Sequence, residues 1–307
     1  MHCENAITLA LNPKLNWEKR LPKLADVRAI DTMIGLPDDP RGLYDALQPV
    51  LGGRDDTEKS PISYLFRNAP DISENADLLA FTLAEMDRFG IERAMVQVDD
   101  DTAMVHRALR EHPDRFFADY LADPNRGMTE VRKIERLKRE FDIKAVSGFP
   151  CGLLPQVPVG DRKWYPIYAK CIELGIPFVP MMGVPGPRLP FAPQDVAQLD
   201  ELCYFFPELT IVTRHGCEPW VDLMVKLMLK WPNLYYSTTA FAPKHYPRAI
   251  IDYANTRGSD KIIYGGYSPY GVSIERGFTE LGDLPLRDHV WAPFLRDNAI
   301  RVFGLSE

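Results

Sequence analysis

Residues 209–216 read Leu-Thr-Ile-Val-Thr-Arg-His-Gly. An apolar run rich in β-branched residues and bounded by turn-forming residues is typical of a parallel strand that is buried on both faces. It lies between two stretches with helical patterning, residues 194–206 and 221–229. The segment therefore predicts a helix–strand–helix unit whose strand delivers His215 at its carboxyl end.

The same alternation continues along the chain in both directions. Strands are expected at 27–33, 93–98, 116–121, 143–148, 176–182, 209–215, 234–239 and 261–266, and helices at 76–89, 102–111, 128–140, 163–174, 194–206, 221–229, 245–256 and 287–303. Eight strand–helix units in series predict a (β/α)₈ TIM barrel with a long loop insertion after the first strand. The rival fold is a doubly wound open sheet, but no Gly-x-Gly-x-x-Gly follows an early strand to support its dinucleotide-binding version.

Turn and cap residues refine this outline. Asp101 or Thr102 is expected to cap the helix after the second strand, and Gly90 and Gly175 are expected in left-handed positions after helices. We expect one domain over 1–307, with an N-terminal extension at 1–25 and an insertion at 36–75 that covers the mouth of the barrel.

Composition narrows the class of protein. The 307 residues are 46% hydrophobic and 26% charged, with a net charge of −7, and basic residues alternate with acidic ones in the predicted helix at 128–140. We therefore expect neither nucleic-acid binding nor a membrane span. Five scattered cysteines and no signal-peptide pattern favour a cytoplasmic protein. A homo-oligomer is compatible with this reading.

In a TIM barrel, the chemistry lies at the carboxyl ends of the strands. The residues expected there are Asp31, Met33, Gly35, Phe149, Met181, Met182, His215, Tyr267 and Ser268. A further acidic run, Asp99–Asp101, follows the second strand and is expected to be loop and helix cap.

Several segments resemble the amidohydrolase-related family typified by aminocarboxymuconate-semialdehyde decarboxylase. They are Ile30-Asp31, the His-Gly pair at 215–216, Trp-Pro-Asn-Leu-Tyr-Tyr-Ser at 231–237 and Lys-Ile-Ile-Tyr-Gly at 261–265. The resemblance implies an Asp-x-His-x-His run on the first strand, a histidine after the fifth and an aspartate after the eighth. At the four positions after Asp31 where the resemblance implies histidine or aspartate, this chain has Met33, Gly35, Met181 and Tyr267.

Zinc in a hydrolase needs about three nitrogen or oxygen ligands from the protein, and a methionine thioether is a poor substitute. We therefore expect no catalytic metal and no cofactor, unless Asp31, Asp99 or Glu218 serves as an unrecognised ligand.

These residues receive roles by their chemistry. His215 is expected as the acid/base, oriented by Asp31, with the Tyr267 phenol donating to a developing oxyanion. Arg188, on a Pro/Gly-rich loop, is expected to clamp an anion, with Met33, Met181, Met182, Phe149 and Ser268 around the substrate.

The leading hypothesis is a metal-independent enzyme that acts on a small organic acid or acyl compound as a decarboxylase-like lyase or a hydrolase. Two alternatives stay open. One is a non-catalytic pseudoenzyme that binds a ligand or a partner. The other is a metal-dependent hydrolase with unrecognised ligands.

Overall fold

The computed structural model describes residues 28–39, 47–52, 62–66, 69–70, 72 and 77–306. The N-terminal extension expected at 1–25 lies outside the described residues, and the insertion expected at 36–75 does so in part. In the described part, no helix is long and apolar enough to cross a membrane.

Eight parallel strands form one sheet in which neighbours in sequence are neighbours in space. They are β1 (Ala29–Asp31), β2 (Ile91–Gln97), β3 (Phe116–Ala122), β4 (Ala145–Gly148), β5 (Phe178–Pro180), β6 (Ile211–Thr213), β7 (Leu234–Ser237) and β8 (Ile262–Ile263). Beyond the ends of β1 and β8, a parallel bridge joins Ile34 to Ser268, and the Gly35 N–H donates to the Ser268 carbonyl at 2.8 Å. The sheet thus curls round to its first strand as a (β/α)₈ barrel, as predicted.

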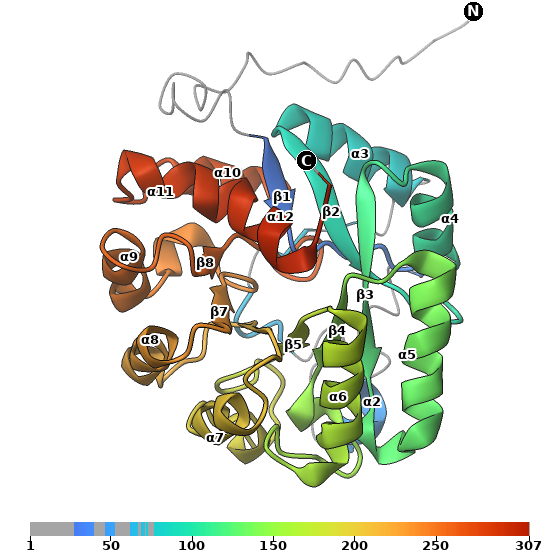
Figure 1. Cartoon of the computed structure of the whole chain (residues 1–307). Helices are drawn as coiled ribbons and strands as arrows, with labels where there is room; N and C mark the ends of the chain where they lie inside the picture. The colour runs from blue at the N-terminus through green and yellow to red at the C-terminus, as the bar shows by residue number, and fades with distance from the viewer. Residues whose placement is uncertain are drawn as a thin grey trace, which may run out of the picture.

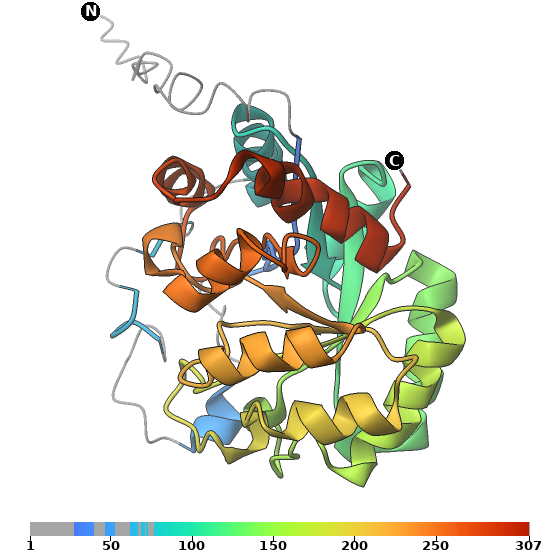
Figure 2. The same ribbon diagram turned by 60° about the vertical axis from the view of Figure 1, so that its left-hand side comes forward.

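Helices surround the strands (Figure 1). They are α2 (Gln48–Leu51), α3 (Leu78–Arg88), α4 (Ala103–Glu111), α5 (Met128–Phe141), α6 (Tyr165–Leu174), α7 (Gln198–Phe205), α8 (Val221–Lys230), α9 (Arg248–Ala254), α10 (Ile274–Leu281), α11 (Asp288–Ala292) and α12 (Asn298–Phe303). Figure 2 shows α7, α8 and α9, coloured yellow to orange, side by side along one flank.

Side chains from alternate strand positions fill the two layers of the core. Ile30, Met95, Phe117 and Val212 belong to a cluster inside the barrel, which Phe303 of α12 also joins. Larger numbers of apolar residues lie between the strands and the helices. The interior is therefore a packed core, and open space for a ligand is left to the strand ends.

Three local expectations differ from the structure. Thr102 is the N-cap residue of α4, but its side chain makes no capping hydrogen bond. The Asp38 carboxylate accepts these bonds instead, from Ala103 N at 2.9 Å and from Met104 N at 2.6 Å. The cap therefore comes from the loop after β1, and the prediction of Asp101 or Thr102 was wrong. The single helix expected at 287–303 is α11 and α12 joined by a π-helical segment, Pro293–Asp297.

The third difference is helix α10, which was not predicted.

The left-handed glycines that the sequence predicted are confirmed, with φ of 69° at Gly90 and 63° at Gly175.

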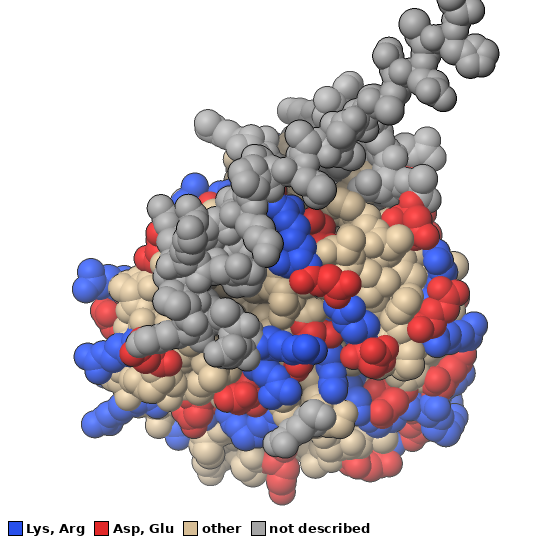
Figure 3. All heavy atoms as spheres, turned by 90° about the horizontal axis from the view of Figure 1, so that it is seen from above, with Lys and Arg blue, Asp and Glu red and all other residues tan. Residues whose placement is uncertain are grey.

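The face seen in Figure 3 carries Lys and Arg side chains interspersed with Asp and Glu. Many charges of the described residues are paired within or between helices, as in Arg107–Glu111 of α4 and Arg88–Glu275 between α3 and α10. Exposed pairs of this kind contribute little to stability and keep the surface polar.

Candidate functional site

A cavity of about 900 Å³ opens at the carboxyl ends of the strands. Its size is within the range of small-molecule sites. Described parts of the segment after β1 contribute Leu47 and residues 62, 64, 65 and 66 to its wall. The rest of the wall consists of Met33, Gln97, Phe149, Met181, Val184, Pro185, Gly186, Pro187, Gln194, His215, Glu218, Pro219, Ala240, Phe241, Ala242, His245, Tyr267, Tyr270, Val272 and Arg276.

The structure brings together about half of the residues that the sequence nominated. Met33, Phe149, Met181, His215 and Tyr267 all line the cavity. Asp31, Met182, Arg188 and Ser268 do not belong to its lining.

His215 lies just after β6 with a left-handed backbone, φ 66°. Its N–H donates to the Thr239 hydroxyl at 3.0 Å, while Nδ1 is buried and has no hydrogen-bond partner among the described residues. Burial, with a smaller effect from the positive charge of Arg214, lowers the pKa of His215 to about 3. The imidazole is therefore neutral at neutral pH.

The turn that carries His215 is strained. Gly216 (φ 87°) and Cys217 (φ 57°) continue its left-handed backbone, and a Cβ on Gly216 would stand 2.4 Å from the Phe241 ring. Ala240, which follows β7 and also lines the cavity, has φ 73°. Non-glycine residues in this conformation cost free energy and concentrate at functional sites, so the cavity is the candidate site on geometric grounds as well.

Asp31 is buried and held by the backbone. Its Oδ1 accepts from Met33 N at 3.0 Å and from Gly266 N at 2.7 Å. Burial outweighs these bonds and raises the pKa of Asp31 to about 6. Among the described residues no hydrogen bond joins Asp31 to His215, so the predicted orienting bond is not formed, and Asp31 instead fixes the junction of the first and last strand ends.

An aromatic wall stands beside His215. The Tyr267 ring meets the imidazole edge to face, with ring centres 5.4 Å apart. Phe66 and Tyr270 pack on Tyr267 at 5.5 Å and 5.3 Å between ring centres. Such a wall suits a flat, apolar or aromatic part of a ligand.

Arg214 points into the barrel interior, where its guanidinium also contacts Met95 of the inner core. Its Nη1 contacts Asp119 Oδ2 at 2.9 Å and Ser147 Oγ at 3.0 Å, and its Nη2 donates to the Thr32 carbonyl at 2.9 Å. Arg214 and Asp119 are buried. This ion pair forms a polar layer between the apolar core and the cavity floor.

The remaining predicted substrate contacts are displaced from the cavity. Arg188 is exposed and its guanidinium stacks over the Tyr64 ring at 5.2 Å. Met182 is fully buried in the core. Ser268 pairs with Ile34 and Gly35 where β8 meets β1. The guanidinium of Arg188 stacks on the Tyr64 ring, a contact between loops that spacing along a sequence does not reveal.

Several polar residues of the cavity were not predicted to act there: Gln97, Gln194, His245, Tyr270 and Arg276. Glu218, named from the sequence only as a possible metal ligand, also lines the cavity. Gln97 ends β2 two positions after Met95, which lies inside the barrel, so strand alternation could have indicated it. Burial raises the pKa of Glu218, and the nearby charge of His245 opposes that shift.

The residues at the expected metal positions do not fit a metal ion. A Cβ on Gly35 would stand 2.7 Å from ring carbons of Tyr270, so the phenol ring fills that space. Met33 and Met181 offer thioethers, and Asp31 Oδ1 is already bonded to two backbone N–H groups. Throughout the described part of the chain, no three His, Cys, Asp or Glu side chains gather as a metal would require.

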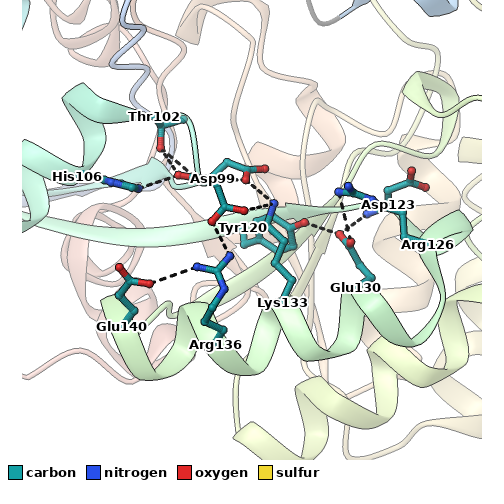
Figure 4. Close-up of polar contacts among 11 residues, drawn as sticks. Asp99, Thr102, His106, Tyr120, Asp123, Arg126, Glu130, Lys133, Arg136 and Glu140 are labelled. Atoms are coloured by element: carbon teal, nitrogen blue, oxygen red, sulfur yellow. Dashed lines mark hydrogen bonds and ion pairs between the residues drawn. The ribbon is translucent and has the colours of Figure 1, made fainter.

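The acidic run after β2 belongs to a surface network rather than to the cavity lining (Figure 4). Lys133 of α5 pairs with Asp99, and Arg136 Nη2 donates to Asp100 Oδ1 at 2.5 Å. This confirms the reading of Asp99 and Asp100 as loop residues and leaves Asp99 committed to a lysine.

Comparisons with known proteins place this fold. A family model described as Amidohydrolase matches residues 27–305. Among solved structures, an uncharacterised TIM-barrel protein from Bordetella bronchiseptica is similar with a TM-score of 0.73 and 22% identity, over 90% of this chain and 98% of that one.

Two neighbours of defined activity share the same architecture. The 5-carboxyvanillate decarboxylase LigW from Sphingomonas paucimobilis has a TM-score of 0.64 and 16% identity, over 91% of this chain and all of that one (100%). The 4-oxalomesaconate hydratase LigJ from Rhodopseudomonas palustris has a TM-score of 0.59 and 19% identity, over 90% and 96%. No curated protein matches the chain in sequence.

Proposed function

Because the chain belongs to the amidohydrolase family, we propose that it is a lyase or hydrolase of a small organic acid and that decarboxylation is its first candidate reaction. The observation that carries the proposal is His215, an imidazole on a strained turn in the cavity wall, with a buried nitrogen that has no partner among the described residues. A buried polar atom without a partner costs free energy unless a ligand or a proton transfer makes use of it.

The electrostatics of His215 favour an acidic substrate. An opposite charge within a few ångströms favours the protonated form of an imidazole. A carboxylate bound beside His215 would therefore raise its pKa from about 3 and draw a proton onto the ring. In a decarboxylation, the bond to the carboxylate carbon then breaks and CO₂ leaves. The electron pair stays on the substrate carbon, which takes the imidazolium proton.

Other groups complete the proposed site. The Tyr267 phenol, in edge contact with the imidazole, is proposed as the donor to a developing oxyanion. Met33, Met181 and Phe149 are proposed as the apolar wall around the substrate. Asp31 is proposed as a positioning residue, since it holds the backbone of Gly266 next to Tyr267.

We further propose that this chemistry needs no metal, on the strength of the donor set at Met33, Gly35 and Met181. The four described cysteines are buried and unpaired, which supports a place in the reducing cytoplasm.

The experiment that tests the function uses purified full-length protein, with and without prior chelator treatment. It is given 2,6-dihydroxybenzoate, 5-carboxyvanillate and 4-oxalomesaconate, and the products are identified by mass spectrometry together with released CO₂. Turnover of at least one acid, unchanged after chelation, is expected. Failure on every acid would contradict the proposal, and activity that is lost on chelation and restored by a metal would contradict its metal-free part.

A further inference from the structure

One cationic side chain of the cavity has no part in the function proposed so far. Arg276 is the single Lys or Arg among the described residues that line the cavity. It comes from the first turn of α10, whose start is fixed by Ser273: the serine hydroxyl accepts from Arg276 N at 3.1 Å. The guanidinium is thus carried by a capped helix directly after β8.

The side chain is held in a way that leaves its outer nitrogens free. Nε donates to Glu280 Oε1 at 2.9 Å, one helical turn further along. Nη1 and Nη2 have no hydrogen-bond partner among the described residues, and the side chain is 30% exposed. Glu280 also faces Lys244, whose Nζ lies 3.8 Å from Oε1, so the carboxylate is shared and does not neutralise Arg276 alone.

This geometry is suited to one class of ligand. With Nε engaged, a guanidinium can still bind a carboxylate end-on through Nη1 and Nη2, a two-pronged contact that fixes both distance and plane. The nearby Glu280 restricts the rotamer of Arg276, so less side-chain entropy is lost on binding. Arg188, the guanidinium expected from the sequence, does not line the cavity; it stacks on the ring of Tyr64, which does.

The two residues proposed to meet carboxylates, His215 and Arg276, come from different parts of the barrel. His215 follows β6, and the cation that acts on it is Arg214 beneath the floor. Arg276 follows β8, and its closest charged partner is Glu280. The Tyr267–Tyr270 aromatic pair lines the same cavity, with the Tyr267 ring against the imidazole of His215.

We propose that Arg276 binds a second, non-reacting carboxylate, and that the substrate is a dicarboxylic acid with a flat unsaturated or aromatic middle. One carboxylate meets His215, the other meets the outer nitrogens of Arg276, and the middle lies against Tyr267. The inference rests on the proposed function for the identity of the reacting end.

The test is equilibrium binding by calorimetry with two probes of nearly equal shape. Isophthalate has two carboxylates, whereas 3-carbamoylbenzoate has one carboxylate and one neutral amide. A charge-assisted bidentate contact predicts that the wild-type protein binds isophthalate roughly 10- to 100-fold more tightly than 3-carbamoylbenzoate. Arg276→Gln should bind both probes with equal affinity, and Arg276→Lys should keep part of the preference.

The matched control is Arg248→Gln on α9, where the arginine side chain is 90% exposed and pairs with Asp252. It should keep the full wild-type preference. The proposal is overturned if wild-type protein binds the two probes equally or binds neither. It is also overturned if Arg188→Gln, and not Arg276→Gln, removes the preference. These binding measurements do not depend on turnover. A failure of the proposed function is therefore distinguished from a failure of the Arg276 proposal, because only the former is seen as an absence of product.

Discussion

The Tyr270 ring occupies the space that a side chain at position 35 would need. A Cβ on Gly35 would stand 2.7 Å from two ring carbons of Tyr270 and 2.8 Å from its hydroxyl oxygen. The two residues come from opposite ends of the chain and meet where β8 returns to β1. Glycine at 35 and tyrosine at 270 therefore form one structural unit, in which a phenol ring fills the space beside the backbone of residue 35.

The first prediction follows from this contact. Gly35→Ala should force the Tyr270 ring out of its position and lower the free energy of unfolding by about 1–3 kcal/mol, the usual cost of overpacking. Adding Tyr270→Ala should remove most of that penalty, so the two changes should be strongly non-additive in urea denaturation. Additive effects would show that the ring and the glycine are not coupled.

The second prediction concerns metal content. Protein purified without chelator should contain far less than one equivalent of Zn, Fe or Mn by elemental analysis, because thioethers and a filled position 35 cannot supply about three nitrogen or oxygen ligands. About one equivalent, held tightly through dialysis, would require ligands from residues outside the described ranges or a different arrangement of the cavity.

Much of the fold could be predicted because its signals are local. Apolar runs gave all eight strands, and Gly90 and Gly175 marked helix ends through a backbone conformation that few other residues adopt. Helix α10 escaped because Gly277 interrupts it and weakens its propensity, although Ser273 and the apolar residues 274, 278 and 281 were signals for it. Missing α10 meant missing Arg276.

The site could be predicted only where strand ends determine it. His215, Met181 and Met33 were placed correctly because each follows a strand directly. Long-range contacts and contacts between loops leave no local pattern in the sequence. Three of them were missed for this reason: the cap of α4 by Asp38, the approach of Tyr270 to Gly35 and the stacking of Arg188 on Tyr64. The low pKa of His215 follows mainly from burial by residues of many elements, which no local pattern records.

The third prediction is a pH dependence of stability due to His215. Its folded pKa, about 3, lies below its ordinary value of 6.5. The unfolded chain therefore binds the proton more tightly, and stability is lost as pH falls from 6.5 towards 3. Between pH 6.5 and 4.5, wild-type protein should lose about 2–3 kcal/mol more than His215→Asn in urea denaturation. Parallel curves for the two proteins would contradict a buried neutral imidazole.

Asp31 should make stability depend on pH in the opposite direction to His215. Its folded pKa, about 6, lies above 3.8, so the folded state binds the proton more tightly and stability is lost as pH rises from about 4 to 6. Relative to wild type, Asp31→Asn should therefore lack a decline in that window. The two opposing dependences make the single variants more informative than the wild-type profile alone.

The fourth prediction concerns the buried Arg214–Asp119 pair. Asp119→Ala leaves a guanidinium buried without its counter-charge and should cost about 3–5 kcal/mol of stability. The matched control, Asp252→Ala, breaks an exposed pair with Arg248 and should cost less than about 1 kcal/mol. Similar, small effects of both changes in urea denaturation would mean that solvent reaches the layer beneath the cavity.

The central claim is that His215 transfers the proton, and the kinetics of His215→Asn test it most directly. Asparagine keeps much of the shape and cannot carry the proton, so kcat on the acid that the wild-type protein turns over should fall by roughly 10²–10⁴-fold. Circular dichroism should show an intact fold, and the affinity for isophthalate should fall far less than kcat. A folded His215→Asn protein that turns over the same acid at the wild-type rate would contradict the account.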